Sequence, residues 1–460
     1  TKGRNIGSED AMVLKLEQRK SELTEQVVAR VRDRLSRDKV VAAERFVRRF
    51  YANVPPDDIL RSNADELYGA AIAIWQFGTM RKPGEALVRV LNPRAEADGW
   101  HTGHTVVEVV NDDMPFLVDS VSAELHRHGL TVHLVIHPVV RIRRDDQGRL
   151  LELCDTTPGA EVPADAVAES YMHIEVEQQT DPAKLEKLAA DIAAVLRDVR
   201  AAVRDFQAMR ARIAQTVTET KSNPLPLPAE EVLEGLSFLR WLDDDHFIFL
   251  GVREYRFGED GGEQTLEIQA GQGLGILADD GVMVFDGLRN FSNLPPEVRS
   301  FVRQQRYLMV TKANKLSTVH RPALLDALMV KVYDDKGVEI GERLFVGLFT
   351  STAYNRSVRD VPFLRQKVSA TVRRAGFDPK GHDGKALLHI LETFPRDELF
   401  QIGEDELFET ALGVLHLQER QRVALFLRRD PFERFVSCLI YVPRDRYDTD
   451  LRHRMQAIVE

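Results

Sequence analysis

The chain has 460 residues, enough for about two to four domains, and 43% of them are hydrophobic, which allows a sizeable core. Its net charge of −10, with 62 basic and 72 acidic residues interspersed, gives little support to nucleic-acid binding, which requires a basic face. No apolar run reaches the roughly 18 residues that cross a membrane, and no signal peptide is visible. We therefore expect a cytoplasmic protein in which Cys154 and Cys438 are reduced thiols.

Residues 1–80 are predicted to form a helical region. Apolar residues recur at helical spacing within residues 11–35, 40–51 and 64–77, and a pair of prolines separates the last two of these segments. The pattern leaves open whether these helices pack on the following domain or against another subunit.

Residues 81–221 are predicted to form a first α/β domain, and residues 106–140 are its most informative part. Apolar alternation predicts a strand over 105–110, and helical spacing from Phe116 to Leu125 predicts a helix that ends at Gly129. Asp112 and Asp113 stand where helix N-caps belong, and Pro115 fits the first turn. A dinucleotide-binding fold has glycines after its first strand, so these acids favour a small ligand-sensing fold instead.

The rest of this domain is predicted from the same patterns. Strands are expected at 86–91, 131–144, 150–154 and 170–177, with a hairpin turn at 145–148. A long helix is expected from Pro182 to Thr216, with Asp181 as its N-cap. The three prolines of residues 222–228 predict an extended linker, and we place a domain boundary there.

The remainder of the chain is predicted to contain three further parts. Residues 222–355 form a second α+β domain with a helix at 229–242 and strands at 246–257, 266–270, 307–313, 326–333 and 339–350. Residues 356–420 form a helical connector with helices at 361–375, 385–393 and 404–416. Residues 421–460 open a third unit with two strands and a helix, and because the chain stops within that helix we expect a truncated domain.

Several long strings resemble one known family. Besides residues 106–140, they are ESYMHIEV at 169–176, FLRWLDDDHFIFLGVREY at 238–255, RSVRDVPFLR at 356–365, GFDPKGHDGKALLHILETFPRDELFQI at 376–402 and YVPRDRY at 441–447. They are similar to the N-terminal part of the very large bacterial NAD-dependent glutamate dehydrogenases, over most of the chain after about residue 40. The resemblance implies that the catalytic lysine and the Rossmann domain, which would bind NAD in the parent enzyme, lie beyond this chain.

From the pattern and the resemblance together we predict a multidomain α+β protein. Its first domain would be an ACT-like α/β sandwich, its second domain PAS-like or ACT-like, and its third unit the start of another ACT-like domain. The segment would be non-catalytic, without a cofactor of its own, and would serve regulation and oligomerisation of an amino-acid-catabolic enzyme. Its expected partners are other copies of itself, in a homotetramer, its own catalytic domain and an amino-acid effector.

The strand-to-helix loop is the candidate effector site, formed by Asn111, Asp112, Asp113 and Phe116. Backbone N–H groups at a helix start can bind an effector carboxylate, and the acidic side chains can bind its ammonium group. The alternative is that these residues only cap the helix. Phe116 occupies the place where ACT sites commonly have glycine and would crowd a pocket, which favours an ACT-like fold used for assembly.

Other motifs are interpreted as structural. His126, His128, His133 and His137 are close in sequence, and His133, His137 and His173 would lie on neighbouring strands, yet no zinc motif occurs and we expect no metal site. The GQGLG string at 271–275 is expected to be a hairpin loop, and the three aspartates at 243–245 a polar turn rather than a cation site.

No catalytic constellation is recognisable, so three hypotheses remain for the chain: an assembly module, an effector sensor, and a stand-alone metal-dependent enzyme.

Overall fold

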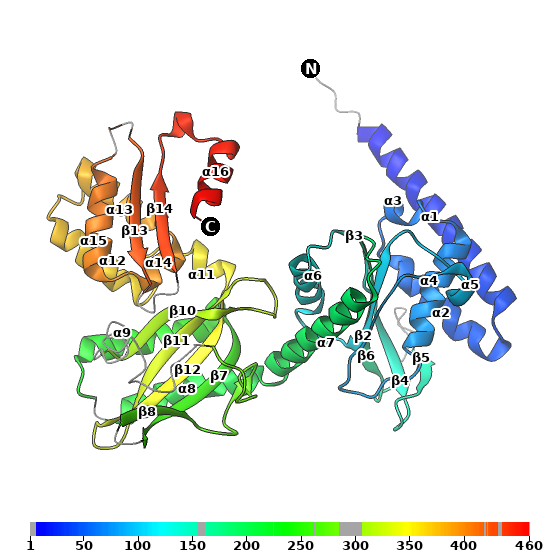
Figure 1. The fold of residues 1–460 in the computed structure, drawn as a ribbon, viewed down its shortest axis with the longest axis horizontal. Helices are drawn as coiled ribbons and strands as arrows, with labels where there is room; N and C mark the ends of the chain where they lie inside the picture. The colour runs from blue at the N-terminus through cyan, green and yellow to red at the C-terminus, as the bar shows by residue number, and fades with distance from the viewer. Residues whose placement is uncertain are drawn as a thin grey trace. The chain divides into compact units, whose positions relative to one another are not determined.

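The computed structural model describes residues 6–154, 162–223, 225–260, 263–284, 306–417, 420, 422–430 and 435–459. The chain forms two compact units (Figure 1). Unit 1 comprises Thr1–Arg200 with Thr318–Pro322, and unit 2 comprises Ala201–Ser317 with Ala323–Glu460. Both units mix helices with antiparallel sheets, which confirms the predicted α+β class. Among the described residues, no helix has the length and apolar character needed to span a bilayer.

Unit 1 begins with the helical region that the sequence predicts. Its helices are α1 (Ile6–Arg34), α2 (Arg37–Ala52), α3 (Pro56–Ile59) and α4 (Ala64–Phe77). The side chain of Asn63 accepts hydrogen bonds from the N–H groups of Asp65 and Glu66, and Glu66 bonds back to the Asn63 N–H, so a capping box starts α4.

The sheet of unit 1 is antiparallel, with the strand order β1-β2-β6-β4-β5 and β3 paired to β6. Its strands are β1 (Leu87–Leu91), β2 (Thr105–Asp112), β3 (Val132–Ile136), β4 (Val139–Arg144), β5 (Leu150–Leu153) and β6 (Val167–Val176). Helices α5 (Ala95–Asp98), α6 (Leu117–Arg127) and α7 (Pro182–Arg204) connect or follow these strands. The single strand predicted over 131–144 is wrong: it is two strands, with His137 and Pro138 between them, and Pro138 lacks the N–H that a continuous ladder needs.

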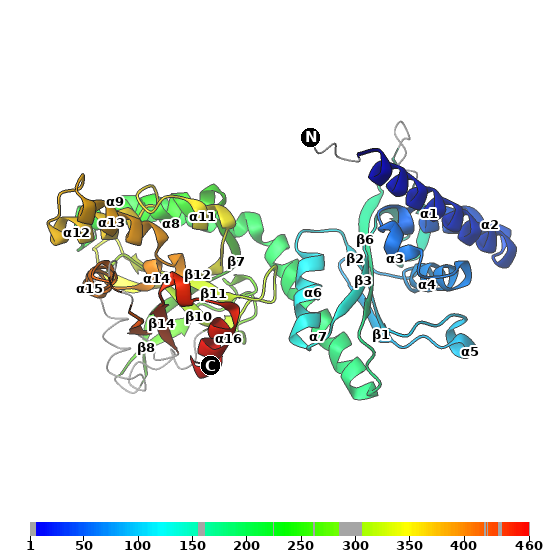
Figure 2. The same cartoon turned by 90° about the horizontal axis from the view of Figure 1, so that it is seen from above.

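Helices cover both faces of this sheet. Figure 2 shows α6 and α7 on one side and α1–α4 on the other. The N-terminal helices share a core with the sheet, in which Phe46 stacks edge-on against Tyr171 of β6 with ring centroids 5.1 Å apart. All residues of β2 from Thr105 to Asn111 are buried, as expected of a strand covered on both sides. The helical region therefore packs on the first domain, which is one of the two arrangements that the sequence left open.

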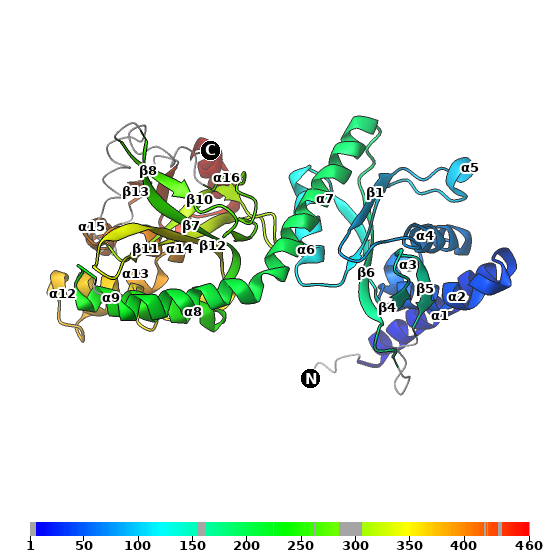
Figure 3. The same ribbon diagram turned by 90° about the horizontal axis from the view of Figure 1, so that it is seen from below.

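Unit 2 contains a second antiparallel sheet with the order β10-β11-β12-β7-β8 and β9 paired to β7. Its strands are β7 (Phe247–Asp260), β8 (Glu263–Ile268), β9 (Leu274–Gly275), β10 (Leu308–Leu316), β11 (Leu324–Tyr333) and β12 (Glu339–Phe349). Helices α8 (Phe206–Ser222) and α9 (Ala229–Trp241) run along one side of it (Figure 3). The first strand lies beside the last, so this sheet does not repeat the topology of unit 1.

The helix predicted from Pro182 to Thr216 is two helices. The Asp181 side chain accepts a hydrogen bond from the Ala183 N–H at 3.0 Å, which confirms the predicted N-cap of α7. The chain breaks at Asp205, whose carboxylate accepts a hydrogen bond from the Gly275 N–H at 2.9 Å. Helix α8 buries Met209, Ile213 and Val217 in the core of unit 2. The division between the units thus lies at residue 200, ahead of the proline-rich segment where we placed a domain boundary.

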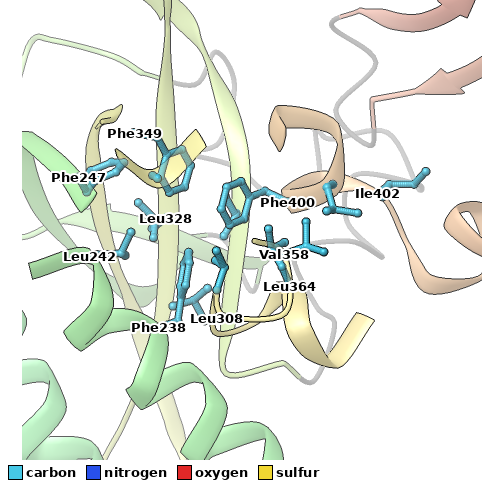
Figure 4. Packing of buried hydrophobic residues seen from close by; sticks show 14 of the residues in the cluster. Phe238, Leu242, Phe247, Leu308, Leu328, Phe349, Val358, Leu364, Phe400 and Ile402 are labelled. Atoms are coloured by element: carbon cyan, nitrogen blue, oxygen red, sulfur yellow. The ribbon is translucent and has the colours of Figure 1, made fainter. Parts of the chain in front are cut away.

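The helical connector packs against the same core. It holds α11 (Ser351–Asn355), α12 (Leu364–Ala375), α13 (His382–Thr393), α14 (Arg396–Gln401) and α15 (Glu404–Leu415). Phe400 of α14 stacks on Phe349 of β12 with centroids 4.3 Å apart and planes 3° apart, and Figure 4 shows it between the sheet and the connector residues Val358 and Leu364. The chain continues through β13 (Ala424–Arg429), β14 (Val436–Tyr441), η3 (Arg444–Arg446) and α16 (Thr449–Val459).

Candidate functional site

The predicted effector loop joins β2 to α6. The structure contradicts the expectation that Asp112 and Asp113 cap this helix, because β2 extends through Asp112 and α6 starts only at Leu117. The N-cap residue is Phe116, which has φ 72° and ψ 1° and makes no side-chain capping bond. Gly129, with φ 72°, follows the C-cap residue His128 as predicted.

The conformation of Phe116 is the left-handed one that glycine adopts without strain. For a residue with a Cβ atom it costs roughly 1–2 kcal/mol, so surrounding contacts must hold it in place. The ring of Phe116 is half-buried and lies 5.2 Å from the ring of His320, centroid to centroid. The aromatic residue therefore keeps the glycine-type backbone and adds a side chain over the helix start.

Asn111 and Asp112 are already engaged by arginines of unit 1. The Arg200 guanidinium donates to Asn111 Oδ1 and Asp112 Oδ2, and Arg81 Nη2 donates to Asp112 Oδ1 at 2.6 Å. Burial raises the pKa of Asp112, but the guanidinium groups of Arg200 and Arg81 outweigh burial and hold it below its usual value. These two side chains orient the loop rather than stand free for a ligand.

Asp113 is the acidic side chain of the loop that remains exposed to solvent. Its backbone N–H donates to the Ala168 carbonyl at 3.0 Å, which fixes the chain where it leaves β2. Of the four predicted effector residues, Asp113 and Phe116 are thus placed where a ligand can reach them, while Asn111 is buried and Asp112 is paired.

Sequence reasoning missed the arginines that hold this loop, Arg81 and Arg200, and also Arg144, which binds Glu169 on β6, opposite Asp112. Arg81, Arg144 and Arg200 lie far apart in the sequence and carry no local motif. Arg144 binds both carboxylate oxygens of Glu169 at 2.7 Å, and Arg81 binds one of them at 2.5 Å. The one available signal is Glu169 itself, an acidic residue within a strand that is mostly buried.

The three histidines considered as metal ligands have other contacts. His137 Nε2 lies 2.6 Å from Ser170 Oγ, His173 Nδ1 lies 3.3 Å from Glu108 Oε1, and the His133 ring stacks on the His104 ring at 4.6 Å. Among the described residues they do not form a set whose ligand atoms lie within 4.8 Å of one another.

A different group of ligand-type atoms is close together, formed by Glu124, His128 and Asp191 on α6 and α7. His128 Nε2 lies 3.3 Å from Glu124 and 3.0 Å from Asp191. Arg127 and Lys187 pair with the two carboxylates at 2.5 Å each. These cations balance the acidic charge, so the group works as an ion-pair network between the two helices.

The two remaining motifs, the glycine string and the three aspartates, lie in turns beside β7. Gly271 has φ 72°, and Leu274–Gly275 forms β9 against β7, so the glycine string is a turn and strand. Gly275 has φ 61°, and a Cβ atom there would lie 2.1 Å from the Leu250 carbonyl oxygen. Asp243 is bound by Arg210 Nε at 2.6 Å, and Asp245 has φ 55°, within a kinked turn before β7.

Unit 1 therefore presents an antiparallel sheet with α6 and α7 on one face and a strand-to-helix loop built on a left-handed residue, which fits an ACT-like domain, while α1–α4 cover the other face. Family models agree with this class and make it specific. The glutamate dehydrogenase ACT1 domain matches residues 46–192, helical motif 1 of the same enzymes matches residues 361–420, and their ACT2 domain matches residues 424–460.

Individual relatives give the same result. The chain is 42% identical over 444 residues to a protein named NAD-specific glutamate dehydrogenase from Halomonas elongata, covering 96% of this chain and 27% of that protein. Proteins of the same name from Pseudomonas aeruginosa and Mycobacterium tuberculosis are 38% and 30% identical, over 90% and 84% of this chain and 25% and 22% of theirs. The chain belongs to the NAD-specific glutamate dehydrogenase family and spans about a quarter of the length of these relatives.

Proposed function

We propose that this chain is the regulatory and assembly segment of a large glutamate dehydrogenase. The parent enzyme would convert L-glutamate, NAD and water to 2-oxoglutarate, ammonium and NADH. The proposal is carried by the succession of ACT1, helical motif 1 and ACT2 along a chain that corresponds to about a quarter of its relatives.

The chemistry of the parent would take place in another part of that protein. The strand pairs among the described residues are antiparallel, whereas dinucleotide-binding folds use a parallel sheet with a helix N-terminus at the pyrophosphate. NAD would accordingly be bound by the parent's catalytic region, which is one partner of this segment. Its other partner would be a second copy of itself, within a cytoplasmic homotetramer that serves amino-acid catabolism.

The first experiment is sedimentation velocity of the 460-residue chain over a wide range of concentrations, together with an assay for NAD reduction by L-glutamate. We expect concentration-dependent dimers or tetramers and no NAD reduction. A strict monomer at every concentration would contradict the assembly role, and NAD reduction by the purified chain would contradict the regulatory role.

A second candidate function is sensing of an amino acid at the loop between β2 and α6. It is favoured by the left-handed Phe116 beside the exposed Asp113, because strained backbone concentrates at sites that bind or switch. An amino acid that binds the folded chain raises its melting temperature by mass action. The rise should disappear in Asp113→Asn and persist in Asp146→Asn, which changes another exposed acid in a separate turn. Equal responses in the two variants would place the site elsewhere.

A further inference from the structure

Unit 1 contains a cavity of about 380 Å³ between its helical layer and its sheet. Helices α2–α4 supply one side, β3 and β6 supply the other, and the segment before β2 closes one end. The residues used below are Tyr51, Trp100, His104, His173 and Glu175. The lining includes no residue of the loop from Asn111 to Phe116, so this cavity is separate from the candidate site already described.

Two buried N–H groups in the lining have no hydrogen-bond partner among the residues that the structure describes. They are Trp100 Nε1 and His173 Nε2, on residues that are 5% and 0% exposed. Glu175 Oε1 lies 3.7 Å from His173 Nε2, close enough for an ion pair with the protonated ring but too far for a hydrogen bond. Buried polar groups in folded proteins are nearly always paired, so the two donors at this cavity offer hydrogen bonds to an acceptor that enters it.

The two donors belong to neighbouring rings. The ring centroids of Trp100 and His173 are 6.0 Å apart, with the planes inclined by 41°. Gly69 of α4 leaves the room for Trp100 to pack closely, because a Cβ atom on residue 69 would lie 2.2 Å from the Trp100 Cβ. The donor pair is therefore preorganised by packing and does not depend on a flexible side chain.

His173 is positioned to carry a positive charge. It faces Glu108 across the β2–β6 ladder and has Glu175 on its other side. Burial lowers the pKa of His173, but the hydrogen bond to Glu108 and the nearby Glu175 outweigh burial and raise the pKa to about 9. In the charged imidazolium both ring nitrogens carry hydrogen, so Nε2 is a charge-assisted donor toward the cavity.

The other polar groups of the lining are of mixed sign. Glu175 accepts a hydrogen bond within the cluster, with Oε2 2.7 Å from His104 Nδ1, and Tyr51 Oη donates to the Leu67 carbonyl at 2.7 Å, so both are already engaged. Glu66 and Asp58 lie nearer the helical side. The volume is at the low end of ligand pockets, which restricts the occupant to a small molecule.

We propose that this cavity binds a small carboxylate-bearing molecule, with the carboxylate accepting hydrogen bonds from Trp100 Nε1 and His173 Nε2. An amino acid would bring an ammonium group that the acidic side chains of the lining can bind, whereas a dicarboxylate would place a second negative charge beside them. This inference goes beyond the assembly role, because it concerns ligand binding by one copy of the chain.

The test measures melting temperature and tryptophan fluorescence of the 460-residue chain with propionate, L-alanine and succinate, and with propionamide as the uncharged control. A carboxylate near saturation should raise the melting temperature by about 2–4 °C and change the fluorescence, while propionamide should do neither. A stronger response to L-alanine than to propionate identifies an amino-acid site, and a stronger response to succinate identifies a dicarboxylate site.

The decisive variants are Trp100→Phe and Trp75→Phe. Both replace an indole that is 5% exposed and whose Nε1 has no hydrogen-bond partner among the described residues, but Trp75 does not line the cavity. Trp100→Phe should weaken binding at least about tenfold, as expected for the loss of a hydrogen bond to a charged group, and Trp75→Phe should leave it unchanged. Each shift is measured against the variant's own melting temperature, so a loss of stability does not imitate a loss of binding.

Gly69→Ala offers a second way to disturb the site, since the added methyl displaces Trp100 without removing a polar group. It should abolish the response while circular dichroism still reports a folded chain. The proposal is overturned if no carboxylate shifts the melting temperature, or if Trp100→Phe and Trp75→Phe respond alike. Sedimentation of the same samples tests the assembly role independently of ligand binding. Self-association does not require the cavity to be filled, so either proposal can fail without the other.

Discussion

Arg81 and Glu169 form an ion pair in which neither side chain has any exposure to solvent, with Arg81 Nη2 2.5 Å from Glu169 Oε1. Arg81 follows the last N-terminal helix and Glu169 lies on β6, so the pair joins the helical region to the sheet. Arg144 binds the same carboxylate through two hydrogen bonds. Glu169 thus pairs with two buried guanidinium groups, and Asp112 is a second counter-ion of Arg81.

Replacing that carboxylate should be severely destabilising. Glu169→Gln leaves Arg81 and Arg144 charged and buried without this counter-ion, and breaking such a pair costs about 3–5 kcal/mol. Urea denaturation of unit 1 should report this loss of free energy of unfolding. The matched control is Glu152→Gln, which breaks an exposed pair with Arg143 and should cost at most about 1 kcal/mol. Similar effects of the two substitutions would contradict the structural role assigned to Glu169.

The charge on His173 predicts a pH dependence of stability. Its pKa is raised from 6.5 to about 9 in the folded chain, so the folded state holds this proton more tightly than the unfolded state. The resulting stabilisation is complete below about pH 6.5, falls as the pH rises, and is lost above about pH 9. The difference between the two pKa values corresponds to about 3 kcal/mol. Denaturation of wild type and His173→Gln across this range should show the decline in the wild type alone, and a parallel decline in both would refute the assignment.

Replacing Glu342 of β12 should increase the stability of the chain, in contrast to the replacement of Glu169. Burial raises the pKa of this carboxyl to about 7, against the influence of Lys331, and its Oε1 has no hydrogen-bond partner within the described part of the chain. The folded state favours the protonated form of this carboxyl, so the free energy of unfolding falls as the pH rises from 4.5 to about 7 and then stays constant. The total loss of free energy of unfolding is about 3 kcal/mol. Glu342→Gln should be more stable than wild type at pH 8 and similar at pH 5. Glu267→Gln, on the exposed side of β8, should change neither value, and a destabilised Glu342→Gln at pH 8 would refute the argument.

Phe116 permits a direct measurement of backbone strain. Phe116→Ala removes the ring and keeps the left-handed penalty of a Cβ atom, whereas Phe116→Gly removes both. The glycine variant should therefore be more stable than the alanine variant by about 1 kcal/mol, measured by urea denaturation. Phe363, in the similar string Pro362-Phe363-Leu364, also has φ 72° before a helix and should show the same order. If the alanine variant were as stable as the glycine variant, the backbone at residue 116 would have left its strained conformation, and the prediction would be wrong.

The sequence by itself determines most of the regular elements, because the signals for them are local. Apolar periodicity places α9, β7, β11 and α15 within a few residues of their observed bounds, and helix-end chemistry identifies Gly129 and Asp181. The resemblance to glutamate dehydrogenases also rests on contiguous strings of residues, which can be recognised without knowing how the chain folds. The class of protein therefore follows from the order of the residues alone.

Interactions between distant segments decide the rest. Local spacing suits Asp112 and Asp113 to helix capping, but pairing with β6 carries β2 through Asp112, and Arg81 and Arg200 bind its carboxylate. The donor pair of Trp100 and His173 is equally invisible in the sequence, since it depends on helices α2–α4 closing over the sheet. Periodicity records which face of an element is buried, but only the folded chain determines what it is buried against.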